Sequence, residues 1–396
     1  MNYTTRDYPQ EYPLRTTVAE IDLSRLRANF RAVCRQAGNI AAMPIIKADA
    51  YGHGIVPCAA ALVHEGATML GVAFAAEAEP LRADKRIPHD MPIAVVTPPF
   101  AHGAAEYCRL NLEFCAASLE TMQAFSAEAV RTGRTLNAHL TLDTGMHRDG
   151  IAPHEALDFM RSVEHLPNIS IHGICTHFAT SDEADKTYFH LQLRRFGDTI
   201  QTLRTAGFEF RYIHAANSGA IANANDEAAF TLIRPGIALY GYNPSGALAE
   251  PLEVQPVMSL KTSIISLRRL AAGEPVSYGR RYTTLRETTI ATIPIGYADG
   301  LRRNLTEKVR VMIGGQYFPI VGTICMDQCM VDIGDADFQI GETVQILGSQ
   351  KSAYAEVGAI RIDALDWAQQ LRTIPYEILT GITARVPRMY INSNTQ

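Results

Sequence analysis

The chain has 396 residues and a formal net charge of −5, and 47% of its residues are hydrophobic and 19% charged. This length exceeds what one hydrophobic core usually holds, so two domains are expected. Basic runs are absent, which argues against nucleic acid or an anionic membrane as a partner. No apolar stretch approaches the length of a membrane span, and the polar N-terminus has no secretion signal. Seven scattered cysteines indicate reduced thiols, so a cytoplasmic location is expected.

Short apolar runs alternate with helical patterns in the first 240 residues. The runs cover residues 43–47, 70–74, 92–96, 112–116, 136–142, 170–176, 211–215 and 236–240. Continuous apolarity is typical of strands buried on both faces, as in parallel sheets. Between them, residues 118–133 form an amphipathic pattern, with Ser118 as the expected N-cap and Gly133 as the stop. Eight strands with helical crossovers predict a (β/α)8 barrel. A doubly wound sheet is the alternative, although no G-x-G-x-x-G follows the first run.

The pattern changes after about residue 250. Residues 257–267, 288–296 and 309–322 are strand-like, and the pair Gly314-Gly315 indicates a hairpin. The predicted fold class is therefore α/β plus all-β. The expected parts are a polar tail at 1–15, a TIM-type barrel at 16–250 and a mainly-β C-terminal domain at 251–396. Residues 16–23 are an additional candidate strand of the C-terminal domain.

Polar residues stand at the carboxyl ends of four predicted barrel strands. Lys47 ends the first, His177 the sixth, Asn217 and Ser218 follow the seventh, and Arg234 opens the eighth. Active sites of such barrels lie at these ends. A lysine in a partly apolar pocket can form a Schiff base, and glycine-rich backbone can bind phosphate. Alone, each residue is more often an ordinary solvated or hydrogen-bonded side chain. Together they predict a pyridoxal phosphate site.

Nine short segments, in order, then carry a specific resemblance. They are "KADAYGHG" (47–54), "DTGMHR" (143–148), "THFA" (176–179), "HAANSG" (214–219), "RPGIALYG" (234–241), "VSYGRRY" (276–282), "IPIGYADG" (293–300), "GTICMDQ" (322–328) and "RVPRMY" (385–390). Over nearly the whole chain they resemble the alanine racemase family. The resemblance implies a pyridoxal phosphate-dependent isomerase that interconverts L- and D-alanine as a homodimer with shared active sites, for peptidoglycan or for alanine catabolism.

Two other functions stay open. A broader-specificity or serine racemase would share the barrel and the lysine, although the bulk of Tyr376 favours alanine. A barrel that carries the cofactor without turnover would lack a C-terminal domain with Tyr278 and Met326, and this chain has both.

The resemblance also implies a role for each matching residue. Lys47 and the partner subunit's Tyr278 would be the bases for D- and L-alanine, on opposite faces of the cofactor aldimine. Arg234 would face the pyridine nitrogen and leave it unprotonated, since arginine does not readily give up its proton. The other implied residues are Tyr51, His177, Asn217, Ser218, Gly236, Ile237 and Tyr376 for the cofactor, Arg148, Met326 and Asp327 for the substrate, and Asp182, Tyr297 and Arg303 at the substrate entrance. Tyrosine has an ordinary pKa near 10, so neighbours including His177 must lower that of Tyr278.

Two positions depart from the family pattern. Thr141 stands where the family usually has a carbamylated lysine that pairs with the arginine corresponding to Arg148, and Thr323 stands where an arginine is common. The adjacent Asp149 is expected to point away from Arg148, because neighbouring side chains alternate in an extended segment. A buried arginine needs an anionic partner. A chloride ion near Thr141 and Arg148 is therefore predicted.

Overall fold

The computed structural model describes residues 15–223, 228, 230–246, 248, 251–353 and 358–393. The chain divides into two compact units. The barrel unit consists of residues 23–257 and 392–396, and the β unit consists of residues 1–22 and 258–391. Within the described ranges, no helix is long and apolar enough to cross a membrane. The predicted tail at 1–15 lies outside the described residues except for Arg15.

Eight parallel strands form the centre of the barrel unit. They are β2 (Ala41–Ala42), β3 (Leu70–Val72), β4 (Ile93–Val95), β5 (Glu113–Ala116), β6 (Leu136–Thr141), β7 (Ile169–Cys175), β8 (Tyr212–His214) and β9 (Leu232–Ile233). Strands β3 to β8 pair in chain order, and β2 pairs with β9. A bridge between Ile45 and Gly71 links the first strand to β3, and the Thr231 N–H donates to the Ile213 carbonyl beside β8. These links close the barrel and confirm the predicted TIM-type architecture.

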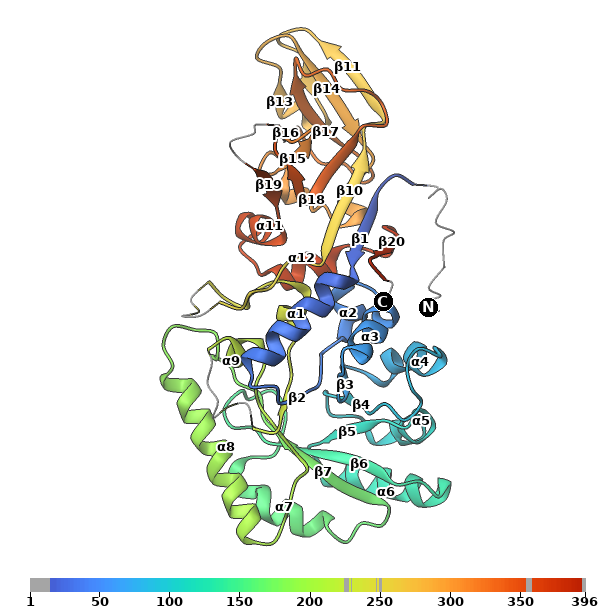
Figure 1. The fold of residues 1–396 in the computed structure, drawn as a ribbon, viewed down its shortest axis with the longest axis vertical. Coiled ribbons are helices and arrows are strands. Elements are labelled where there is room, and N and C mark those ends of the chain that lie inside the picture. The colour runs from blue at the N-terminus through green and yellow to red at the C-terminus, as the bar shows by residue number, and fades with distance from the viewer. Residues whose placement is uncertain are drawn as a thin grey trace. The chain divides into compact units, whose positions relative to one another are not determined.

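Helices cover the outside of these strands. They are α1 (Leu23–Gln36), α2 (Lys47–Gly52), α3 (Ile55–His64), α4 (Ala75–Ala83), α5 (Ala104–Leu110), α6 (Leu119–Thr132), α7 (Ala156–Val163), α8 (Thr187–Thr205) and α9 (Ser218–Ala222), with 3-10 turns η1 (Ala101–Gly103), η2 (Pro153–Glu155) and η3 (Ile237–Tyr240). Figure 1 shows α4 to α8 arranged around the strands. The limits predicted for α6 are confirmed, because Ser118 Oγ accepts from the Thr121 N–H and Gly133 ends the helix with φ +64°.

The eighth barrel strand was predicted at residues 236–240, and this prediction is wrong. The strand is β9, and residues 237–240 form the 3-10 turn η3. Pro235 follows the strand and has no N–H to continue the ladder. The run after it is fully buried, and buried turns and buried strands share the same continuous apolarity.

The β unit is built on one large sheet. Its strands are β1 (Val18–Asp22), β10 (Met258–Ser263), β11 (Ser266–Leu270), β12 (Pro275–Val276), β13 (Tyr282–Thr283), β14 (Thr288–Ile293), β15 (Arg310–Ile313), β16 (Gln316–Val321), β17 (Cys329–Gly334), β18 (Thr343–Lys351), β19 (Ala359–Ile362) and β20 (Arg388–Ile391). Its helices are α11 (Ala364–Leu371) and α12 (Pro375–Gly381), with 3-10 turns η4 (Tyr278–Arg280), η5 (Tyr297–Asp299) and η6 (Arg303–Leu305). The order in the large sheet is β11-β14-β17-β16-β15-β18-β10-β1-β20, with β19 paired to β18 off this path, and β12 and β13 form a separate two-stranded sheet.

Two local features of the β unit bear on the sequence predictions. Strands β15 and β16 pair across Gly314 and Gly315, which both have positive φ, so the predicted hairpin is confirmed. Strand β1 pairs antiparallel with β10, and Arg15 just before it donates two hydrogen bonds to the buried Asp299 carboxylate at 2.7 and 2.6 Å. The start of the described chain therefore belongs to this unit.

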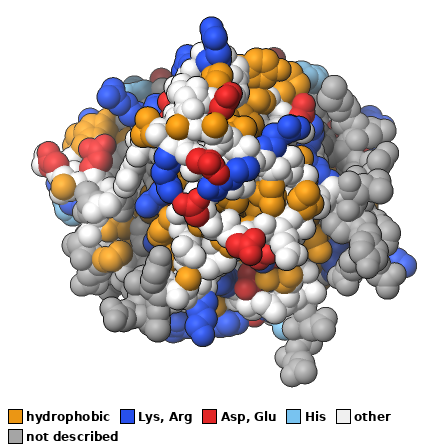
Figure 2. All heavy atoms as spheres, turned by 90° about the horizontal axis from the view of Figure 1, so that it is seen from above, with side chains coloured by type: hydrophobic (Ala, Val, Ile, Leu, Met, Phe, Trp, Pro, Cys, Tyr) orange, Lys and Arg blue, Asp and Glu red, His pale blue; other side chains and the backbone are white. Residues whose placement is uncertain are grey.

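The molecular face shown in Figure 2 carries acidic, basic and hydrophobic side chains intermixed. Neither charge sign forms a broad field on that face.

Candidate active site

Lys47 lies at the carboxyl end of the first barrel strand and begins an unusual turn. Residues 48–51 all have φ between +53° and +54° and therefore form a left-handed turn. Each non-glycine residue in this conformation costs roughly 1–2 kcal/mol. The Ala50 N–H donates to the Ile46 carbonyl at 2.8 Å, and the Ile55 N–H donates to Asp49 Oδ1 at 2.7 Å. Strain that surrounding contacts maintain is a feature of functional sites.

Three basic side chains and a histidine gather at this end of the barrel. Burial, and then the charge of Arg148, lower the pKa of Lys47, while Glu77 acts in the opposite direction. Burial, followed by the charges of Arg234, Arg148 and Lys47, lowers the pKa of His177 to about 3. The imidazole is therefore neutral at physiological pH. A lysine with a lowered pKa beside other cationic groups suits a nucleophile that works next to an anionic ligand.

Arg234 is held by a dense set of hydrogen bonds. Its Nη1 donates to His214 Nδ1 at 2.7 Å and to the His214 carbonyl at 2.6 Å. Its Nη2 donates to the carbonyls of Thr176 and Ala215 at 2.6 and 3.2 Å, and it lies 3.4 Å from His177 Nδ1. A guanidinium has five N–H donors, and these four bonds use those on both terminal nitrogens. Among the described residues none accepts from Arg234 Nε, so this donor is left for a ligand.

Backbone N–H groups converge beside the eighth strand. The Gly236 and Ala238 N–H groups both donate to Ser218 Oγ, at 2.9 and 3.3 Å. A Cβ on Gly236 would lie only 2.8 Å from the Tyr51 hydroxyl, so this close approach requires glycine. The Tyr51 ring stacks on Tyr240 with centroids 4.7 Å apart. Converging N–H groups with a nearby hydroxyl fit a phosphate group.

Asn217 has a structural task at the same place. Its Oδ1 accepts from the Gly219 and Ala220 N–H groups at 3.0 Å each and from Ser181 Oγ at 2.7 Å. The side chain therefore caps α9, which begins with Ser218. These bonds fix the position of Ser218 whether or not Asn217 also touches a cofactor.

In the β unit, Tyr278 is displayed on the surface with 72% of its area exposed, and Met326 is 52% exposed. The backbone next to Tyr278 is clamped. Thr323 Oγ1 donates to the Tyr278 carbonyl at 2.8 Å, and Ser277 Oγ donates to the Thr323 carbonyl at 2.6 Å. Ser277 has φ +64°, a conformation unfavourable for serine. The clamp thus holds a strained backbone that presents an exposed phenol.

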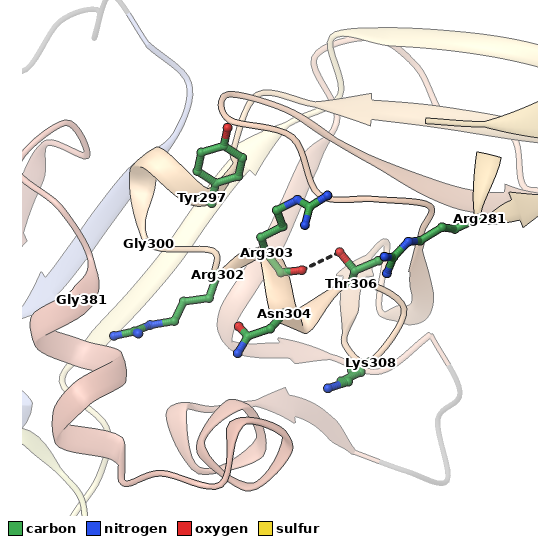
Figure 3. Close-up of a pocket in the computed structure, with 9 residues that line it drawn as sticks. All are labelled: Arg281, Tyr297, Gly300, Arg302, Arg303, Asn304, Thr306, Lys308 and Gly381. Carbon is green, nitrogen blue, oxygen red and sulfur yellow. Dashed lines mark hydrogen bonds between the residues drawn. The ribbon is translucent and has the colours of Figure 1, made fainter. Parts of the chain in front are cut away.

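A pocket of about 760 Å³ lies within the β unit (Figure 3). Its lining residues are Arg281, Tyr297, Gly300, Arg302, Arg303, Asn304, Thr306, Lys308 and Gly381. Four of these side chains are cationic and none is acidic. Tyr297 and Arg303, which the sequence predicts at the substrate entrance, both belong to it. Arg302 Nη2 is paired with Glu377 Oε1 at 3.0 Å, and the lining still has an excess of positive charge.

Comparisons with known proteins agree with this arrangement. The family model for the alanine racemase N-terminal domain matches residues 21–244, and the model for the alanine racemase C-terminal domain matches residues 257–390. The chain belongs to the alanine racemase family. The resemblance expected from the nine sequence segments is therefore confirmed.

Individual relatives cover nearly the full length. The alanine racemase of Clostridium novyi is 39% identical over 386 residues, which are 96% of each chain. That of Desulfovibrio desulfuricans is 41% identical over 378 residues, which are 94% of this chain and 97% of the relative. Among solved structures, alanine racemase from Clostridium difficile 630 superposes with a TM-score of 0.88 at 35% identity, covering 97% of this chain and 98% of that chain. A histidine racemase from Leuconostoc mesenteroides superposes with a TM-score of 0.87 at 26% identity, covering 97% and 100%.

Arg148, a family arginine, has a partner that the sequence argument rejected. Its Nε lies 3.4 Å from Asp149 Oδ2. The expectation that Asp149 points away is wrong because residues 143–150 form bends rather than an extended segment, with His147 at φ +54°. The neighbouring Thr141 hydroxyl contacts the His139 carbonyl at 3.4 Å and Cys175 Sγ at 3.5 Å.

The other predicted residues divide between the two units. The barrel unit contains Lys47, Tyr51, Arg148, His177, Asp182, Asn217, Ser218, Arg234, Gly236 and Ile237. The β unit contains Tyr278, Tyr297, Arg303, Met326, Asp327 and Tyr376. Asp327 Oδ1 accepts from Arg385 Nη2 at 2.7 Å. The predicted roles of these residues in binding remain predictions.

Sequence reasoning missed Glu77, which connects two parts of the site. Its Oε1 accepts from the Ala48 N–H and its Oε2 from the Ala73 N–H, both at 2.7 Å. It thereby ties the left-handed turn after Lys47 to the loop before α4. An acidic residue in the first turn of a helix is common for dipole reasons alone, so the sequence carried no distinguishing signal.

Proposed function

We propose that this chain is a pyridoxal phosphate-dependent alanine racemase that works as a homodimer. The observation that carries the proposal is the strained end of the first barrel strand, where Lys47 has a lowered pKa beside Arg148, His177 and the spare N–H of Arg234. The names of the relatives in the same family support the substrate. The product D-alanine would serve peptidoglycan synthesis or alanine catabolism.

The residues present fit the cofactor. Ser218, the N–H groups beside Gly236 and Ile237, and the Tyr51 hydroxyl would hold its phosphate, and the Arg234 Nε–H would face its ring nitrogen. Tyr376 of the β unit is proposed for the same phosphate. When bound, pyridoxal phosphate supplies an electron sink that stabilises the carbanion left at Cα. His177 would stay neutral, and its Nδ1 lies beside Arg234 Nη2.

Two residues would move the α-proton. Lys47 Nζ would accept it from D-alanine on one face, and burial and the charge of Arg148, which lower its pKa, favour the neutral amine that this role needs. The partner subunit's Tyr278 would act on the opposite face for L-alanine. A proton must leave one face and return to the other, so one base cannot easily serve both enantiomers. The exposure of Tyr278 and Met326 favours such a partner, which would remove both side chains from water.

Charged groups would orient the substrate. Arg148 would bind the alanine carboxylate, helped by the Met326 N–H and Asp327 of the partner subunit. The basic pocket lined by Tyr297 and Arg303 would collect carboxylate substrates from solution. Asp149 supplies Arg148 with an anion, so the electrostatic reason for a chloride ion near Thr141 falls away, and chloride is not part of the proposed function.

The alternative is a racemase with broader specificity. The superposition with a histidine racemase shows that this fold accepts other amino acids, at least in that relative. Purified protein incubated with the cofactor and L-alanine should form D-alanine, measured by chiral chromatography, with serine and histidine as competing substrates. Equal rates for all three would favour broad specificity, and no racemisation of any would reject the proposal.

The lysine assignment has a direct test. Borohydride reduction of the purified protein should attach the cofactor to the peptide that contains Lys47. Lys186 is a matched control, since its Nζ donates to the Ser181 carbonyl in the same unit. A label on Lys186 or Lys261 instead would show that Lys47 is not the attachment site.

A further inference from the structure

Four buried side chains form a continuous hydrogen-bonded chain through the barrel interior. Arg234 Nη1 contacts His214 Nδ1 at 2.7 Å, His214 Nε2 contacts His139 Nδ1 at 2.8 Å, and His139 Nε2 contacts Glu113 Oε2 at 2.7 Å. Each of the four residues is at most 9% exposed. The links join three barrel strands, β5, β6 and β8, to the end of β9.

The position of every proton along this chain follows from its first member. A guanidinium only donates, so His214 Nδ1 must present a lone pair to Arg234. His214 therefore carries its proton on Nε2 and donates to His139 Nδ1. His139 in turn carries its proton on Nε2 and donates to the carboxylate of Glu113. Both imidazoles are neutral, and the direction cannot be reversed because arginine has no acceptor.

The far end of this hydrogen-bonded series must be a hydrogen-bond acceptor for His139 Nε2–H. Burial acts to raise the pKa of Glu113, but hydrogen bonds from His139 and from Asn137 Nδ2 at 3.1 Å hold that pKa below its ordinary value. The carboxylate is therefore ionised. Burial, followed by the charge of Arg234, places the pKa of His214 well below its ordinary value. A cation at one end and an anion at the other are thus connected by two oriented imidazoles.

We propose that Glu113 is a positioning residue for the site, acting on Arg234 through His139 and His214. By accepting from His139 Nε2, it holds the His139 ring against His214, and it thereby maintains the proton order that Arg234 imposes and keeps the His214 lone pair on Arg234 Nη1. With Nη1 and Nη2 engaged, the guanidinium is held in one orientation, and its Nε–H would be available to the ring nitrogen of the cofactor. The inference rests on the proposed function for the last step only. The tautomers follow from this chain's own contacts.

The test compares two substitutions of Glu113. A glutamine can still accept from His139 Nε2 through its amide oxygen, whereas a leucine cannot. In protein with ¹⁵N-labelled histidine, long-range ¹H–¹⁵N correlations should show Nε2–H tautomers for His139 and His214, both as purified and after removal of the cofactor. Glu113→Gln should keep them. Glu113→Leu should lose the fixed tautomer of His139 and the slow-exchanging proton between the two rings.

Activity is the second readout. Glu113→Leu should lower kcat roughly tenfold or more with little change in KM, while Glu113→Gln should stay within about threefold of the parent enzyme. Leu140→Ala is the matched control, because Leu140 is a fully buried neighbour in β6 with no polar role. It should lower thermal stability and leave the tautomers and kcat unchanged.

The outcomes separate the two proposals. Unaltered tautomers and kcat in Glu113→Leu, or an Nδ1–H tautomer of either histidine in the parent protein, would overturn the positioning role. A loss of kcat in Leu140→Ala equal to that in Glu113→Leu would show a merely structural effect and would also overturn it. Absence of racemisation by the parent protein would instead reject the proposed function, whatever the histidine spectra show.

Discussion

The two units present their functional residues in opposite ways. In the barrel unit, Arg234 is buried and its terminal nitrogens are saturated with hydrogen bonds, and Lys47 is half-buried in a strained turn. In the β unit, Tyr278 is 72% exposed, and the contacts described above hold only its backbone. The barrel unit thus holds its polar groups in an ordered cluster, whereas the β unit displays an exposed phenol. This difference is the physical argument for an active site shared between subunits.

The largest expected effect comes from placing substitutions of Lys47 and of Tyr278 on different subunits of one dimer. Lys47→Ala and Tyr278→Phe homodimers should each lose nearly all racemase activity. In a mixed dimer, one site combines both substitutions and the other combines neither. Random exchange of the two variants should therefore restore about one quarter of the parent activity, since half of the dimers are mixed and each has one intact site.

Subunit exchange must be shown independently, by native mass spectrometry of differently tagged chains. The matched control mixes Lys47→Ala with Lys47→Arg subunits, which cannot form an intact site in any combination. Mixed dimers without activity would show that Lys47 and Tyr278 of one chain serve the same site.

The two units also differ in their histidine content. All 12 histidines of the sequence lie between residues 53 and 214, within the barrel unit. Burial and nearby cations lower the pKa of His177 to about 3 and that of His214 well below its ordinary value. In the unfolded chain both would take up protons near pH 6.5. Between pH 6.5 and about 3 the unfolded state therefore binds more protons, and the stability of the barrel unit falls as the pH falls.

The free energy of unfolding should fall by at most about 1.4 kcal/mol per pH unit for each such histidine. Hydrogen exchange with mass spectrometry at pH 7, 5.5 and 4.5 should show opening of barrel peptides before peptides of the β unit. His177→Gln should flatten the acid dependence by the share of one histidine. Earlier opening of the β unit over this pH range would contradict the prediction that the buried histidines make the barrel unit the acid-sensitive one.

These contrasts also show what a sequence can and cannot reveal. Strand ends were readable, because continuous apolar runs place Lys47, His177 and Arg234 at one end of a barrel. The hairpin at Gly314-Gly315 and the cap at Ser118 were readable because turn and cap chemistry is local. The run after Pro235 was misread, because a buried 3-10 turn and a buried strand share one pattern.

Contacts between distant residues were not readable. Glu113 and His139 look like isolated polar residues in apolar strands, and only the pairing of β5 with β6 brings them together. Asp149 was misjudged because the expected extended backbone is bent there. The left-handed turn at residues 48–51 had no signal, since none of its four residues is glycine and tertiary contacts maintain it.

The clamp beside Tyr278 predicts a smaller effect. Thr323→Val keeps the shape but removes the hydroxyl that donates to the Tyr278 carbonyl. Loss of one such bond is worth about 1 kcal/mol, so α-proton exchange from L-alanine should fall roughly fivefold. Exchange from D-alanine, which depends on Lys47, should fall less. Thr323→Ser retains the hydroxyl and should restore the rate, and an equal loss in both directions would argue against a role in holding Tyr278.

The smallest expected effect concerns the strain in the barrel unit. Ala48 has φ +54° and ψ +50° and is exposed. Glycine reaches this conformation without the Cβ penalty, which is roughly 1–2 kcal/mol, but it costs roughly 0.5–1 kcal/mol more backbone entropy on folding. Ala48→Gly should therefore leave the free energy of unfolding unchanged or raise it by up to about 1.5 kcal/mol.

The matched control is the same substitution in a right-handed helix. Ala127 is exposed within α6, so Ala127→Gly should lower the free energy of unfolding by about 1 kcal/mol. Pulse proteolysis at increasing urea concentration, read on peptides of the barrel unit, gives the free energy of unfolding of that unit in each variant. The two substitutions are chemically identical and differ only in the backbone they meet. A loss at Ala48 equal to that at Ala127 would therefore mean that residues 48–51 do not form the left-handed turn, and that Lys47 is not held on strained backbone.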